Sequence, residues 1–73
     1  MMKAKVNLET GSSIKKFVEV CSRVPESVYL EDGDNFRVSA KSLLGAIATM
    51  DWREVYVICE KDIRGYILDF LAD

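Results

Sequence analysis

Apolar and polar residues alternate strictly at the start of the chain. The segment 3–9 places three apolar side chains, Ala4, Val6 and Leu8, on one face and polar side chains on the other, which predicts a strand with one buried face. From Ile14 the apolar positions recur at helical spacing, directly after polar residues that supply candidate N-caps. A helix is therefore predicted here, and it ends before a proline, because the residue preceding proline is pushed out of helical geometry.

The middle of the chain predicts a hairpin and a short helix. Two alternating segments, 28–31 and 36–39, flank a cluster of turn-forming residues. Residues 39–42 then introduce a helix with one apolar side. Gly45 lies inside this helix at a cost of about 1 kcal/mol relative to alanine, so we expect close packing to require it.

The last third of the chain predicts a central strand and a final helix. The run 54–60 is apolar on both faces, which is typical of a strand in the middle of a sheet. Asp62 is a candidate N-cap, and five apolar residues at helical spacing follow it: Ile63, Tyr66, Ile67, Phe70 and Leu71. The order of elements is then β-α-β-β-α-β-α in one domain over residues 1–73. It predicts a split β-α-β arrangement, an α+β sandwich with helices on one face of an antiparallel sheet.

Composition and charge exclude several classes of function. The 73 residues are 49% hydrophobic and 30% charged, with a net charge of −2, whereas nucleic-acid binders usually carry a basic excess for phosphate contacts. No apolar run approaches the roughly 20 residues of a membrane span, and the amino terminus lacks the apolar core of a signal peptide. We therefore expect a cytoplasmic protein that binds neither nucleic acid nor membranes.

The chain contains two cysteines and no histidine. Cys21 and Cys59 share no metal-ligand spacing, and too few thiols are present for a structural zinc site, so we expect no metal. Buried free thiols are the ordinary interpretation of both residues. The sequence has no recognisable motif of paired catalytic carboxylates, no glycine-rich phosphate loop and no nucleophile–base pair. We therefore expect no enzymatic activity and no cofactor.

The chain reads Ser-Arg-Val-Pro-Glu-Ser-Val-Tyr-Leu-Glu over 22–31 and Phe-Arg-Val-Ser-Ala-Lys-Ser-Leu-Leu-Gly over 36–45. These segments resemble the HPr phosphocarriers of the bacterial sugar phosphotransferase system. In that family a strand reads Val-Thr-Leu-Glu, and Lys-Ser-Ile/Leu-Met/Leu-Gly opens the second helix. The match at Lys41–Gly45 is the most specific part, and the pattern of elements extends over nearly the whole chain. The resemblance implies the HPr fold, an open-faced sandwich with sheet order 1-4-2-3.

One part of the family pattern is missing. HPr proteins carry a phosphoryl group on a histidine just before the first helix, with an arginine two positions later and then a proline. Here that position falls in Thr10–Ser12. Imidazole forms a phosphoramidate of high transfer potential, whereas a serine or threonine phosphoester is too stable to pass the group on. A thiophosphate on Cys21 is the remaining alternative, but its place on an apolar stripe favours a core thiol. The resemblance therefore implies no catalytic residue and no histidine phosphocarrier.

A second family feature is retained at Ser42. This residue aligns with the serine that an ATP-dependent kinase phosphorylates in HPr proteins of some bacteria as a regulatory mark. A phosphoserine at a helix N-terminus gains charge-assisted bonds from backbone N–H groups. The alternative is that Ser42 only caps or begins the helix.

The apolar residues after Ser42 are Leu43, Leu44 and Ile47. By position they match residues with which HPr proteins meet their partners, and we expect Leu44 and Ile47 partly exposed, with Leu43 shared between core and surface. An exposed aliphatic patch on an acidic protein indicates a protein partner, although core packing is the commoner role of a single leucine. Trp52 either extends this patch or covers the sheet edge.

We therefore expect an HPr-like regulatory or adaptor protein. The expected partner is a transcriptional regulator or a component of the phosphotransferase system. Tyr29, Tyr56 and Ile58 are expected on the outer sheet face, where a second copy of the chain is a better cover than RNA because flanking basic residues are few. The alternative is a ferredoxin-like domain that senses a ligand or binds nucleic acid and resembles HPr by accident. Its common sheet order is 4-1-3-2.

Overall fold

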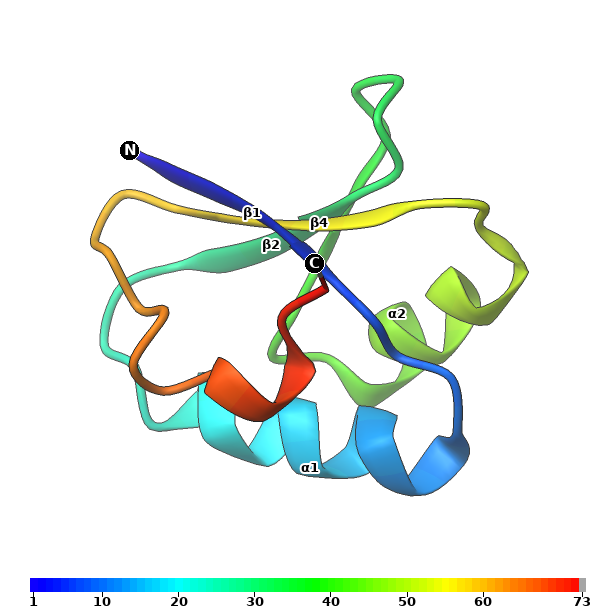
Figure 1. The fold of residues 1–73 in the computed structure, drawn as a ribbon, viewed down its shortest axis with the longest axis horizontal. Coiled ribbons are helices and arrows are strands. Elements are labelled where there is room, and N and C mark those ends of the chain that lie inside the picture. The colour runs from blue at the N-terminus through cyan, green and yellow to red at the C-terminus, as the bar shows by residue number, and fades with distance from the viewer. Residues whose placement is uncertain (73) are drawn as a thin grey trace.

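The computed structural model describes residues 1–72 and contains a four-stranded sheet with two α-helices on one face (Figure 1). The strands are β1 (Met2–Val6), β2 (Val28–Glu31), β3 (Arg37–Ser39) and β4 (Val55–Cys59). The helices are α1 (Gly11–Ser22) and α2 (Leu43–Ala48), and two short 3-10 helices, η1 (Thr49–Asp51) and η2 (Leu68–Phe70), complete the described elements. No helix among residues 1–72 is long and apolar enough to cross a membrane.

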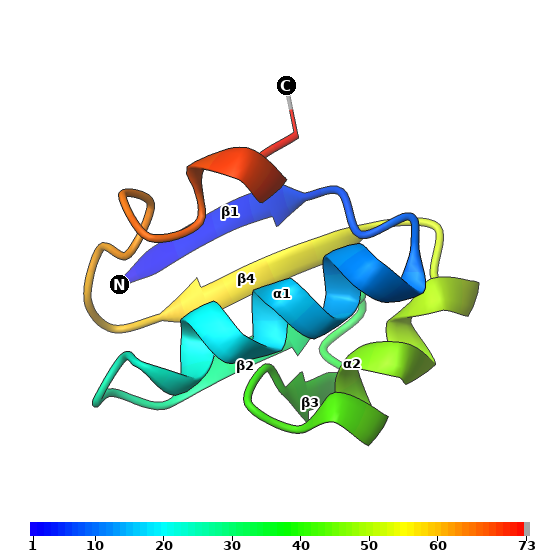
Figure 2. The same ribbon diagram turned by 90° about the horizontal axis from the view of Figure 1, so that it is seen from below.

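The strand order in the sheet is β1-β4-β2-β3, and every neighbouring pair is antiparallel. This order confirms the expected 1-4-2-3 and differs from the 4-1-3-2 of the ferredoxin-like alternative. In Figure 2, β4 runs between β1 and β2. Val57 and Cys59 of β4 face the helices at 0% and 1% exposure, and Ile58 on the opposite face is only 5% exposed. The central position predicted from two apolar faces is therefore confirmed.

The core lies between the sheet and α1. Three side chains on one side of α1, those of Ile14, Phe17 and Cys21, are fully buried, as their helical spacing predicts. They pack against the alternating residues of β1, of which Val6 is 4% exposed. Burying a large apolar side chain contributes about 1.5–3 kcal/mol, so this layer makes a large contribution to the free energy of unfolding.

The ends of the first strand and helix follow from local hydrogen bonds. The hydroxyl of Thr10 accepts a hydrogen bond from the Ser13 N–H, and α1 therefore begins at Gly11. The helix ends at Ser22, before the proline. The first strand is shorter than the predicted segment 3–9, because after Val6 the chain leaves β4 and the Asn7 N–H donates to the Phe70 carbonyl instead.

The predicted final helix is wrong. Residues after Asp62 form turns and then only the three-residue η2. Ile63 and Ile67 are fully buried, so the apolar spacing marked the correct anchors, but Tyr66 is 55% exposed. A helix of about ten residues is marginal on its own, and Gly65 lowers its stability further.

The C-terminal segment instead pairs with the free edge of β1. Leu71 forms a bridge with Val6, and the Ala72 N–H donates to the Lys5 carbonyl at 2.9 Å. Both views show this segment running beside β1 (Figures 1 and 2). These backbone hydrogen bonds protect an edge that a helix would have left open.

Candidate functional site

Ser42 is exposed and forms the N-cap of α2. Its Oγ accepts a hydrogen bond from the Gly45 N–H at 3.2 Å, and its carbonyl accepts the first helical hydrogen bond from Ala46. The capping interpretation is therefore confirmed. Modification of the same hydroxyl stays a prediction, and the exposure of Ser42 leaves it accessible to a kinase.

Gly45 brings α2 close to β3. A Cβ atom at this position would lie 3.2 Å from the Ser39 carbonyl oxygen and 3.3 Å from the Cβ of Val38. Both distances are shorter than ordinary van der Waals contact. The expectation that close packing requires this glycine is confirmed, because any side chain here would press on β3.

The outward side of α2 is apolar. The exposed fractions are 45% for Leu43, 82% for Leu44, 44% for Ile47 and 50% for Met50 in the adjoining η1. We call these four residues the α2 surface. The expected exposure of Leu44 and Ile47 is confirmed, and the buried contact of the helix comes from Ala46 instead. The segment 35–50 contains no acidic residue, and the next carboxylate along the chain is the exposed Asp51, directly after Met50.

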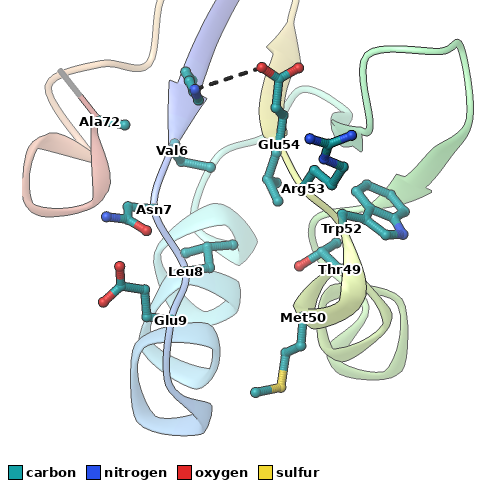
Figure 3. A pocket seen from close by; sticks show the side chains of 12 residues that line it. Val6, Asn7, Leu8, Glu9, Thr49, Met50, Trp52, Arg53, Glu54 and Ala72 are labelled. Carbon is teal, nitrogen blue, oxygen red and sulfur yellow. Dashed lines mark ion pairs between the residues drawn. The ribbon is translucent and has the colours of Figure 1, made fainter.

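Trp52 packs against Phe36. The two ring centroids are 5.7 Å apart in an edge-to-face arrangement, and the indole also contacts the core. Phe36 directly precedes β3, the edge strand of the sheet. The contact therefore favours the interpretation in which Trp52 covers the sheet edge. Figure 3 shows the Trp52 ring directed toward the hairpin.

A cleft of about 510 Å³ lies between the end of β1 and the segment that connects η1 to β4 (Figure 3). The Lys5 ammonium and the Glu54 carboxylate pair across it at 3.8 Å. The Thr49 hydroxyl, which is the alcohol in its lining, donates to the Ala46 carbonyl at 2.7 Å. The proton of the Thr49 hydroxyl is therefore engaged by a backbone carbonyl and not by a neighbouring base.

The residues at the position expected for a phosphoryl-carrying histidine form the start of α1. Thr10 accepts from the Ser13 N–H and donates its own proton to the Ser13 Oγ at 3.0 Å. Gly11 and Ser12 are exposed residues in the first turn of the helix. These three residues begin a helix, and the structure shows no second role for them.

Both cysteines are free and buried, as expected. Burial and the neighbouring Cys59 raise the pKa of the Cys21 thiol to about 12. A thiol with such a pKa is protonated at neutral pH and is a poor nucleophile, which argues against phosphoryl transfer through Cys21. Among the described residues no group of three potential ligands is placed to hold a metal ion.

The sequence did not reveal an ionic network on the outer sheet face. The Glu31 carboxylate, with its side chain 5% exposed, accepts from Arg37 at 3.0 Å and from Lys3 at 3.2 Å. These hydrogen bonds, the Arg37 one foremost, hold the pKa of Glu31 below its usual value. The alternation of each strand already placed the three residues on one face, but only the sheet order brings them together.

The two tyrosines of this face lie beside the same cations. The Lys3 Nζ lies 4.8 Å from the centre of the Tyr56 ring, and the Arg37 guanidinium 5.9 Å from that of Tyr29. Tyr29 and Ile58 are register partners in β2 and β4, as expected for the outer face. A second copy of the chain against this face stays a prediction.

Comparison of the chain with protein-family models, curated proteins and solved structures found no match.

Proposed function

We propose that this chain is an HPr-like regulatory or adaptor protein that docks a protein partner through the α2 surface and is switched by phosphorylation of Ser42. One observation carries the proposal: an exposed serine at the start of α2 is followed directly by Leu43 and Leu44, which are 45% and 82% exposed. The protein acts in the bacterial cytoplasm and does not relay phosphoryl groups through histidine, because it has none.

The α2 surface has the character of a docking site. Four large apolar side chains on consecutive turns face outward, although the same helix buries only Ala46. Exposing them costs free energy that a partner recovers by covering them.

The position of Ser42 suits an electrostatic switch. A phosphate on its Oγ adds nearly two negative charges beside the α2 surface. The backbone N–H of Gly45, which now binds the hydroxyl, is a donor for a phosphate oxygen. Phosphorylation therefore changes the charge of the docking surface without requiring α2 to move.

The relation to HPr proteins rests on the Lys41–Gly45 motif and is supported by the sheet order. The nearest analogue is the catabolite-repression HPr homologue, which lacks the carrier histidine, keeps the regulatory serine and binds a transcriptional regulator. We propose a regulator of that class as the partner. The segment after β4 departs from the family pattern, since turns and η2 replace the last helix.

Phosphorylation by an HPr kinase tests the switch. The purified chain is incubated with ATP and the kinase, and tandem mass spectrometry locates the phosphate. We expect phosphate on Ser42 of the wild type and of Ser12→Ala, a matched change at an exposed serine, and none on Ser42→Ala. An unmodified wild type, or a phosphate that persists in Ser42→Ala, contradicts the switch.

A further inference from the structure

We draw no further inference here: the strongest candidate, the outer face of the sheet where Tyr29 and Tyr56 lie beside Arg37 and Lys3, is a surface for which nothing among the described residues 1–72 shows what covers it.

Discussion

The Oγ of Ser42 accepts a hydrogen bond from the backbone N–H of Gly45, with 3.2 Å between the two atoms. The same hydroxyl is therefore both the cap of α2 and the proposed phosphorylation site. Its two roles are separable by substitution, because aspartate caps a helix as well as serine does, whereas alanine does not.

Ser42→Ala should destabilise the protein by about 1 kcal/mol, because a donor at the start of α2 loses its partner. Ser42→Asp should stay within about 0.5 kcal/mol of the wild type. Urea unfolding followed by circular dichroism measures both. If alanine proves as stable as serine, the hydrogen bond to Gly45 does not hold the start of α2.

Gly45→Ala should destabilise the protein even though alanine favours a helix by about 1 kcal/mol. The new Cβ would meet the Ser39 carbonyl oxygen at 3.2 Å, and this backbone atom cannot yield without moving β3. Gly11→Ala is the control in α1, since nothing lies within 4 Å of its added Cβ, and it should stabilise slightly. Thermal unfolding of the two variants should therefore shift in opposite directions; an increase in melting temperature for Gly45→Ala would show that α2 is not held against β3.

The elements that alternate or recur with a clear period were predictable from the sequence. The hairpin, α1 and the central strand β4 have the predicted types, and their ends differ by a few residues. The last segment was not predictable, because its apolar residues fit a helix equally well. Leu71 contributes instead to a bridge with Val6, a partner far away in the sequence. Pairing with a distant strand leaves no local signal.

The candidate functional sites also comprise features that the sequence predicted and features that it did not. Exposure of Leu44 followed from the short helix and its position in the motif. The Glu31 ion pairs depend on the sheet order and on the paths of long side chains, which periodicity does not encode. Glu31 is a single charged residue on an alternating strand, and nothing in the sequence indicated that it would be buried.

The network at Glu31 predicts a dependence of stability on pH. Hydrogen bonds from Arg37 and then Lys3 lower the pKa of Glu31 in the folded protein. Its contribution is therefore fully present above the ordinary carboxyl pKa near 4.5 and is lost as the pH falls through the lower folded pKa. Glu31→Gln should be less stable than the wild type at pH 7, and the difference should shrink below pH ~4.

Urea midpoints between pH 7 and pH 3 measure this difference. Glu19→Gln, an exposed change of the same kind, should follow the wild type throughout. A constant gap between the wild type and Glu31→Gln across this range would mean that the ion pairs do not depend on ionised Glu31.

The most direct measurement of the central claim is a ¹⁵N–¹H titration of the Ser42-phosphorylated chain with the transcriptional regulator bound by the catabolite-repression HPr homologue. We predict that shifts and line broadening concentrate on residues 42–50, and that Leu44→Asp abolishes them. Leu68→Asp, at a residue 66% exposed in η2, should leave them intact. Both substitutions lie at exposed positions and should leave the fold unchanged. Binding that is equally strong in Leu44→Asp, perturbation confined to other elements, or no binding by the phosphorylated chain would contradict the account.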